Sequence, residues 1–523
     1  MTTVAATIVA MVVLGAAGLL PTLALVGRRW ITFPLVPLAG GVIAALAATV
    51  FVAVGGTFMV WFVSLAAVAA AVTGVVWLRW PTRRPWVVEP GSDRRFTPGY
   101  RLFGALGALG IVAACAWCLR DLSTPTVGFD ARALWLTRAG WLLHSHQQLL
   151  ITLRSPTLVL GQSAYPPLVS ASTAVSWSVT GNHTLRLGVV VTALLNTCAL
   201  AVASFALVEC GRRAAGRLAA TAERVWTVVP MVGGVVAAVL LVFIAFGITE
   251  PFMTNGYADP LWSLAALGAV AYGLQMRVGR SEQGAVLVLL LVAGMSKDEG
   301  VATASALIVL IALRWLVTMP ADRRRILWWR PVVVGAVELA AVAAWPVLMR
   351  LIHARGQTSG TLSPAGDWVS RAHATADGMA PYLHVLVLAA PVAVVGGLLL
   401  SGVRRRSGVA NDGWGWVGLA CGLVAVGGAL VVGSSGIAAW LLTTVHRVTE
   451  FPALTGWWIV ATWAVVASAS PAIARLQVRA GSREATGAAL PEPVPEDGRE
   501  DPTGPGEGTG ARPGPAPRVP EMR

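Results

Sequence analysis

The sequence predicts an all-α fold, a polytopic transmembrane helical bundle, and three observations lead to that prediction. Of the 523 residues, 56% are apolar and only 12% are charged, whereas a soluble chain has about a quarter charged residues. Apolar runs of about twenty residues, the length that crosses a bilayer core, recur along most of the chain. Short blocks of arginine separate these runs. Together they predict about 11 to 14 spans within residues 1–474.

The arginine blocks predict the orientation of the spans. The formal net charge is +14, but the basic residues lie in short blocks beside apolar runs, which is typical of cytoplasmic loops facing anionic lipid. We therefore expect membrane lipid as a partner and no nucleic acid. The arginine- and alanine-rich composition indicates a GC-rich bacterium, so we expect a multi-pass protein of the bacterial inner (plasma) membrane. The blocks that decide the orientation lie at 28–29, 79–101, 212–224, 323–325 and 404–406.

The first large outer loop, 121–165, is the stretch around which the chain is organised. Its apolar residues are spaced as in a helix that lies in the membrane interface. Asp130 stands at the start of this helix, where the helix dipole favours a carboxylate. It is either a simple N-terminal cap or a functional acid. The apolar positions are Phe129, Ala133, Leu134, Leu136, Trp141 and Leu142.

Two further stretches depart from simple spans. The apolar segment that follows the loop is short and begins at Pro166 and Pro167, and it cannot cross if the next arginine block is cytoplasmic. We expect it to be re-entrant or shallow, with its backbone covered by protein. The tail 475–523 is rich in Pro, Gly, Glu and Arg, so we expect it to be disordered and cytoplasmic.

Four polar clusters fall on the outer face when the crossings are counted. Ionisable residues in a membrane protein tend to be paired and functional because isolated charges are costly there. We therefore expect the clusters to meet in one site with an extracytoplasmic opening. They are Asp130 with Arg132 and Arg138; Glu250 with Asn255, Tyr257 and Asp259; Lys297 with Asp298 and Glu299; and His446 with Arg447 and Glu450.

Lys297 carries the sharpest signal, because it is the only lysine in the sequence. A lysine is a compact point charge suited to phosphate, and arginine does not replace it equivalently. The alternative is a local ion pair with Asp298 or Glu299. Two short apolar runs flank this SKDEG stretch, which predicts a hairpin with Lys297 at its outer tip.

The other clusters leave more than one interpretation open. Asp259 precedes Pro260 at the start of an apolar run, so it is either a helix cap or a functional acid. Arg447 either reaches toward the interface, pairs with Glu450, or binds a ligand.

Five motifs in fixed order resemble a known family. GFDARALWLTRAGWL, YPPL, GYADP, SKDEG and HRVTEFP, within residues 100–470, resemble the GT-C superfamily of polytopic glycosyltransferases, especially its protein-mannosyltransferase-like and aminoarabinose-transferase-like branch. The resemblance implies a GT-C type bundle, a donor sugar on a polyprenyl phosphate, and a catalytic base in the first outer loop. That loop often carries paired acids, whereas Phe129 and Ala131 flank Asp130 here.

This resemblance implies roles for individual residues. Asp130 would be the general base, Lys297 and Arg447 would hold the donor phosphate, and the acceptor would be an envelope glycan, lipid or protein. Arg132 and Arg138 are alternates for the phosphate. The acceptor or sugar pocket would include Tyr165, Pro166, Pro167, Glu250, Tyr257, Asp259, Glu299 and His446. No metal is required, although Asp259 and Glu250 are also candidates for a divalent ion.

Two other function classes fit a charged membrane bundle. A lipid-linked sugar flippase or secondary transporter predicts charges near the middle of the spans and access from both faces. An inactive envelope scaffold predicts that loss of Asp130 has no consequence.

Overall fold

The computed structural model describes residues 2–79, 98–155, 165–218, 224–275, 280–319, 321–354, 365–399, 412–432 and 444–469. These residues form helices joined by turns and loops, with no strand among them. Ten of the helices are long and apolar enough to cross a membrane, or eleven if a pair bent by 77° counts as one span. The described chain is therefore an all-helical, multi-pass membrane protein. The predicted disordered tail and the arginines at 83–95 and 404–406 lie outside the described residues.

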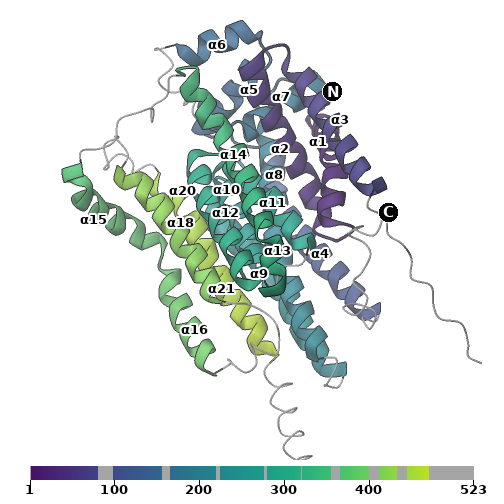
Figure 1. Ribbon diagram of the computed structural model, residues 1–523, viewed down its shortest axis with the longest axis vertical. Coiled ribbons are helices and arrows are strands. Elements are labelled where there is room, and N and C mark those ends of the chain that lie inside the picture. Colours follow the sequence, from purple (N-terminus) through teal and green to yellow (C-terminus); the bar gives the residue numbers. More distant parts are fainter. Residues whose placement is uncertain are drawn as a thin grey trace, which may run out of the picture. The chain divides into compact units, whose positions relative to one another are not determined.

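The helices follow one another without other regular structure (Figure 1). The first half contains α1 (Thr3–Val26), α2 (Thr32–Val54), α3 (Phe58–Arg79), α4 (Pro98–Cys118), η2 (Arg120–Ser123), η3 (Ala131–Leu136), α5 (Thr137–Trp141), α6 (His146–Arg154), α7 (Leu168–Thr180), α8 (Leu185–Leu218) and α9 (Arg224–Thr249). The second half contains α10 (Asp259–Val270), η4 (Ala271–Gln275), α11 (Arg280–Gly294), α12 (Asp298–Thr318), α13 (Ala321–Leu327), α14 (Trp329–Leu351), η5 (Ala365–Asp367), α15 (Trp368–Met379), η6 (Ala380–Tyr382), α16 (Val385–Leu399), α18 (Asp412–Val432), α20 (Val445–Val448) and α21 (Glu450–Ser468).

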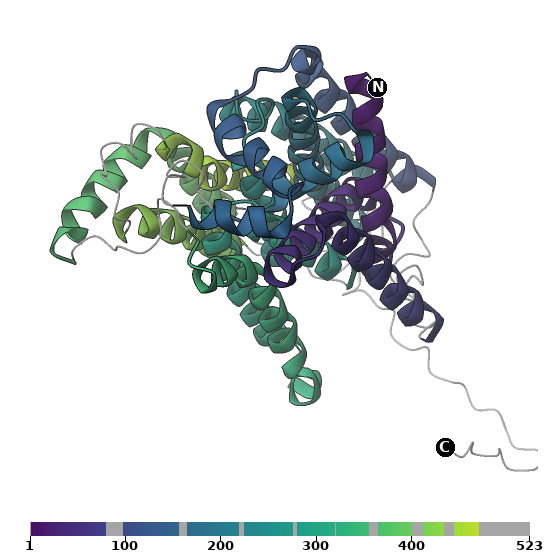
Figure 2. The same ribbon diagram turned by 90° about the horizontal axis from the view of Figure 1, so that it is seen from above.

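Helix α10 is the centre of the bundle. Every one of its residues is buried, as expected of a helix that is apolar on all sides. It packs against α8, α11, α12 and α21. Helices α1 to α3 lie on one side of this core, and α15, α16 and α18 lie on the other (Figures 1 and 2). The first residue of α10 is Asp259, so the central helix carries a candidate site residue at its N-terminus.

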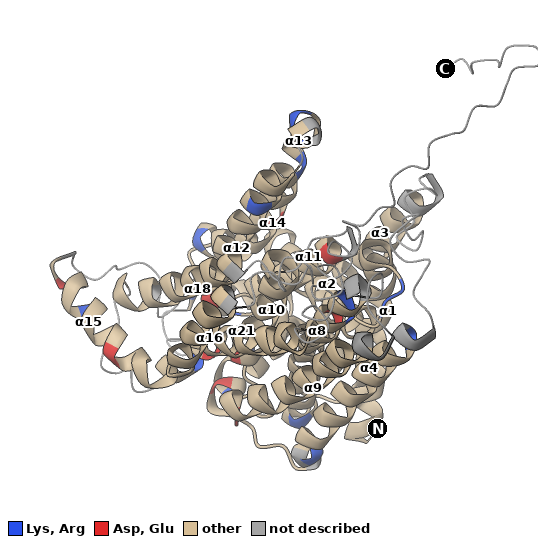
Figure 3. Ribbon diagram, turned by 90° about the horizontal axis from the view of Figure 1, so that it is seen from below, with Lys and Arg blue, Asp and Glu red and all other residues tan. Residues whose placement is uncertain are grey.

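One end of the bundle is tied together by arginines, and we call it the arginine end. Glu282 of α11 accepts hydrogen bonds from Arg29 at 2.8 Å and from Arg213 at 2.7 Å. Glu209 of α8 accepts from Arg212 at 2.6 Å and from Arg213 at 3.1 Å. Arg29 and Arg213 come from two blocks that were predicted to share one side of the membrane, and their common partner Glu282 places both at one end of the bundle. Figure 3 shows the few charged positions against the mostly uncharged helices.

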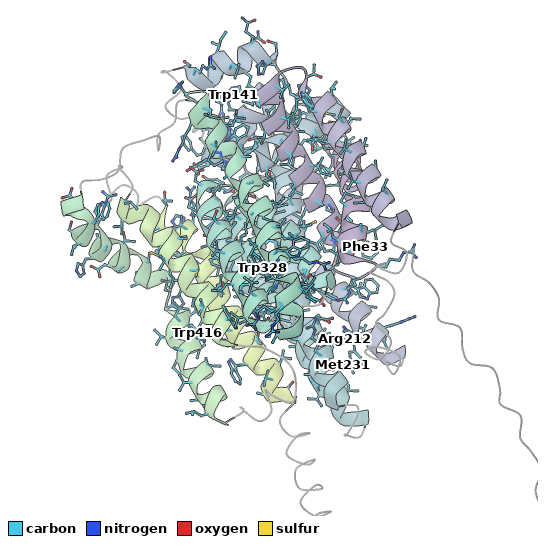
Figure 4. All side chains as sticks on the ribbon, viewed as in Figure 1. Phe33, Trp141, Arg212, Met231, Trp328 and Trp416 are labelled. Carbon is cyan, nitrogen blue, oxygen red and sulfur yellow. The ribbon has the colours of Figure 1, made fainter. Side chains whose placement is uncertain are left out.

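The opposite end carries the first large loop, and we call it the site end. Nε2 of the His146 ring lies 3.0 Å from the carbonyl oxygen of Val52, at the C-terminus of α2. Arg154 donates to the carbonyl oxygen of Ile352 at 2.9 Å, just after α14. Figure 4 shows Trp141 of the loop and Arg212 toward opposite ends. That the site end faces away from the cytoplasm stays a prediction.

The segment that begins at the proline pair does not cross as a separate span. Helix α7 has 13 residues, which at 1.5 Å per residue is about 20 Å, less than a bilayer core of about 30 Å. Its first residue, Leu168, donates its N–H to the carbonyl of Met295 at 2.9 Å. At its other end the Trp177 indole donates to Thr184 beside the start of α8. The segment therefore returns to the site end, as predicted for a re-entrant piece.

Lys297 lies at the turn between α11 and α12, as predicted for the hairpin, but it is buried inside the bundle. Helix α11 has only 15 residues, a rise of about 22 Å. Starting from the arginine end, it stops before it could cross a bilayer core of about 30 Å. Lys297 therefore lies inside the bundle, surrounded by helices.

The predicted apolar face of the first loop is only partly correct. Leu134, Leu136 and Leu142 are buried as expected, but Phe129 is 69% exposed. Trp135 and Arg138, outside the predicted face, are also buried. Within this segment η3 is a π-helix, whose wider turn shifts the side chains that follow Asp130 relative to an α-helix. A location of this segment in the membrane interface stays a prediction.

Candidate functional site

Arg447 joins two helical segments that are far apart in the sequence. Its Nη1 donates to Oδ2 of Asp130 in a short ion pair, and its Nε lies 3.9 Å from Oδ1 of Asp259. The side chains of Asp130 and Arg447 are 20% and 11% exposed. This pair therefore lies at the more accessible edge of the polar cluster. Arg447 reaches Asp130 rather than Glu450, which had been the local alternative.

Lys297 and Asp259 form the deep part of the same cluster. Nζ of Lys297 lies 2.6 Å from Oδ1 of Asp259 and 3.3 Å from Oε1 of Glu299. Burial by itself would lower the pKa of Lys297, but the two carboxylates outweigh it, so the pKa is raised and the ammonium stays charged. The pair with Glu299 agrees with the local alternative, while the pair with Asp259 was not foreseen. Asp130, Arg447, Asp259, Lys297 and Glu299 thus form one connected network, which we call the site network.

Ion pairs are the closest contacts of both site aspartates. Asp130 is the residue before η3 and makes no side-chain cap hydrogen bond, so its capping interpretation is wrong. Asp259 is the first residue of α10 and pairs with Lys297. Their carboxylates bind Arg447 and Lys297, because a buried or half-buried charge gains more from an opposite charge than from a neutral N–H.

Backbone contacts fix the position of Asp130. The N–H of Gly128 donates to the carbonyl of Asn255 at 3.0 Å, and the N–H of Asp130 donates to the Tyr257 hydroxyl at 3.4 Å. A Cβ on Gly128 would lie only 2.2 Å from Cε2 of Tyr257. The chain can pass this close to the tyrosine ring only because residue 128 is a glycine.

Aromatic rings surround the Arg447 guanidinium. Its Cζ lies 5.1 Å from the centre of the Tyr257 ring and 5.9 Å from that of Phe252. The two rings are themselves 4.9 Å apart, and Phe252 also contacts the His446 ring at 5.2 Å. Burial and the nearby Asp130 charge raise the pKa of Tyr257, so its hydroxyl keeps its proton at neutral pH. These rings hold the cation without neutralising it.

Arg138 lies in a second group beside the network. It donates to the carbonyl oxygen of Tyr165, and its Cζ lies 5.6 Å from the centre of the Trp345 ring. The Tyr165 ring stacks on Trp135 at 5.4 Å and lies 5.9 Å from Nζ of Lys297. Burial lowers the pKa of Arg138 to about 10, which still leaves it charged at neutral pH. Pro166 and Pro167 are buried directly after Tyr165.

Two of the predicted site residues are exposed to solvent. Arg132 is exposed on η3, and Glu250 is exposed at the end of α9. A helical turn carries Arg138 inward and leaves Arg132 outward, which the sequence spacing alone did not decide. His446 lies at the edge, between the rings of Phe252 and Tyr382.

Several polar residues near the network were not among the predicted site residues. Glu450 is buried, and its Oε2 accepts from the Ser263 hydroxyl at 3.2 Å. Asn196 of α8 donates to the carbonyls of Met253 at 3.2 Å and Tyr257 at 3.5 Å, so it holds the loop before α10. An amide in the middle of an apolar span was the signal that could have identified Asn196.

The network has unused acceptor capacity. Oδ2 of Asp259, Oε2 of Glu299 and Oε1 of Glu450 are buried, and within the described part of the chain none of them has a hydrogen-bond partner. Such oxygens are costly to leave unpaired and would be satisfied by donor groups of a ligand. Among the described residues, no group of three or more His, Cys, Asp or Glu side chains is arranged to hold a metal ion.

Comparisons with family models, curated proteins and solved structures gave no significant match.

Proposed function

We propose that the protein is a membrane glycosyltransferase that moves a sugar from a polyprenyl-phosphate donor to a cell-envelope acceptor on the extracytoplasmic face. The observation that carries the proposal is the ion pair of Arg447 with Asp130, beside the buried pair of Lys297 with Asp259. It brings two carboxylates and two cations from four segments together at one end of the bundle. Transfer from a sugar phosphate needs both kinds of group within reach of one another.

The reaction assigns a role to each member. The Asp130 carboxylate accepts the proton of the acceptor hydroxyl, and the acceptor oxygen bonds to C1 of the sugar. The bond from C1 to the phosphate oxygen breaks, and its electron pair stays with the polyprenyl phosphate. Arg447 is the main ligand for that phosphate, because its planar fork matches phosphate geometry. Lys297 adds positive charge from the deeply buried part of the site network, although the carboxylates of Asp259 and Glu299 already balance much of that charge.

Two features support a sugar as the other ligand. The unpartnered carboxylate oxygens of Asp259 and Glu299 would accept hydrogen bonds from sugar hydroxyls. Tyr257 and His446 lie beside Arg447, where aromatic faces would contact the ring of the sugar or the acceptor. Tyr165 and Arg138 border Lys297 on the other side. Glu250 and Arg132, which are exposed, are not assigned a role.

The deep burial of Lys297 and Asp259 favours a second candidate, a flippase or secondary transporter for lipid-linked sugars. Charges inside a membrane bundle also mark translocation paths. A transporter would move the labelled lipid across the membrane without covalent transfer. The location of Asp130 in a loop, at the accessible edge of the network, favours the enzyme.

The test uses purified protein in proteoliposomes with a radiolabelled polyprenyl-phosphate sugar and a crude envelope acceptor fraction. We expect transfer by the wild type and a loss of at least about 100-fold in Asp130→Asn, the size typical of removing a general base. Arg186→Gln, which replaces an exposed arginine at the start of α8, is the matched control and should retain full transfer. Wild-type transfer by Asp130→Asn would exclude Asp130 as the base. Movement of the label across the bilayer without a glycosylated product would favour the transporter.

A further inference from the structure

The Arg447 guanidinium is only partly used by the residues around it. Of its five N–H donors, Nη1 is bonded to Asp130, while the buried Nε has no hydrogen-bond partner within the described part of the chain. Nε lies 3.9 Å from Asp259, too far for a hydrogen bond. An incoming anion with two adjacent oxygens would satisfy more of these donors than one carboxylate oxygen does.

Asp130 and Arg447 differ in how firmly they are held. The backbone on either side of Asp130 is fixed by the Gly128 bond to Asn255 and by the bond from its own N–H to Tyr257. Arg447 lies on α20, a helix of only four residues, and beyond Asp130 its long side chain is held by ring faces and by Asp259 at 3.9 Å, which is too far for a hydrogen bond. If the pair separates, the Arg447 side chain is therefore the part that moves.

From these contacts, and resting on the proposed function, we infer that Arg447 is a positioning switch that exchanges Asp130 for the donor phosphate. Without donor, Arg447 holds an oxygen of the Asp130 carboxylate. The phosphate of the donor competes for the guanidinium and releases that oxygen. The base is then free to accept a proton only when the leaving group is already bound, so donor binds before acceptor.

The exchange has a consequence for binding that does not depend on catalysis. If phosphate binding breaks the pair of Asp130 with Arg447, then removing the Asp130 carboxylate must strengthen phosphate binding, because the two equilibria are linked reciprocally. If the ion pair had only a structural role, removing the Asp130 carboxylate would weaken phosphate binding, because the residues of the site would be less firmly held. Simple repulsion between Asp130 and the phosphate also predicts tighter binding, but it would not require Arg447.

The experiment is a double-mutant cycle on binding. Full-length protein in nanodiscs is titrated with labelled polyprenyl monophosphate, with polyprenol as the control lipid lacking phosphate. We expect Asp130→Asn to bind about tenfold more tightly than wild type and Arg447→Gln to bind more weakly. In the Arg447→Gln background, Asp130→Asn should have no further effect. Asp377→Asn removes an exposed carboxylate on α15 and should bind like wild type.

Each result decides the inference. Unchanged or weaker binding by Asp130→Asn overturns it, provided that thermal unfolding shows the variant to be folded. Asp130→Ala serves as the second variant if the first is unstable. Tightening that persists in the Arg447→Gln background overturns it in favour of repulsion. If the wild type binds polyprenyl monophosphate no better than polyprenol, the proposed function fails and the inference falls with it.

Discussion

Lys297 and Asp259 meet through Nζ and Oδ1 at 2.6 Å, and both side chains are 1% exposed. They come from the N-terminal ends of α12 and the central helix α10. Because both charges are removed from water, each depends on the other for its solvation. The pair therefore fixes the positions of the N-termini of α10 and α12 within the bundle. It also forms the most deeply buried part of the site network.

We expect Lys297→Met to destabilise the protein by about 3–5 kcal/mol, because it removes the nearest cation from the buried Asp259 carboxylate and leaves only Arg447 at 3.9 Å. The double variant Lys297→Met with Asp259→Asn should recover at least half of that loss, since no charge at the pair is then left without a partner. Neither variant should transfer sugar. Denaturant or thermal unfolding in detergent measures the stability. A double variant as unstable as the single one would mean that the ion pair is not the cause.

Gly128→Ala tests the close approach of the loop to Tyr257. The new Cβ would lie 2.2 Å from a ring carbon, so either the ring or the backbone next to Asp130 must move. We expect transfer to fall by about tenfold or more, since small displacements of catalytic groups are costly. The matched control is Gly140→Ala in α5, where a Cβ meets nothing within 4 Å.

Gly140→Ala should be neutral or stabilising by up to about 1 kcal/mol, because alanine favours the helix. The two substitutions are chemically identical and lie 12 residues apart in the same loop. Equal activities of the two variants in the proteoliposome assay would show that contact with Tyr257 does not position Asp130.

Glu282→Gln tests the arginine end. Its carboxylate is shared by Arg29 and Arg213 at 2.8 and 2.7 Å, so neutralising it weakens two charge-assisted hydrogen bonds at once. We expect a loss of about 1–3 kcal/mol in stability with little change in transfer, because the site network lies at the other end. Thermal unfolding measures the loss of stability, and the transfer assay measures the change in activity. A large loss of transfer with intact stability would instead show that the two ends are coupled.

The sequence was sufficient for the class of fold and for the end at which the polar residues gather. Apolar runs and arginine blocks are local properties, and the bilayer dimension converts them into helices of known length and order. That is why the arginines at 28–29 and 212–213 could be placed at one end, and why the short segment after Pro167 could be recognised as returning to its starting side.

Partner choice needed the tertiary structure. Asp130 could equally have capped its helix, and Arg447 could have paired with Glu450 three residues away. The pair that forms spans 317 positions, and only the packing of α20 and α21 near the first loop brings it together. Likewise the direction of Arg138 depends on the π-helical turn of η3, and the burial of Lys297 depends on the length of α11.

By itself, then, the sequence determined a multi-pass helical protein with its candidate site residues gathered at the end opposite the arginine blocks, because hydrophobicity and charge act residue by residue. Which carboxylate meets which cation, and how deeply, was decided only by the tertiary structure, because an ion pair depends on distances between side chains that the chain order leaves free.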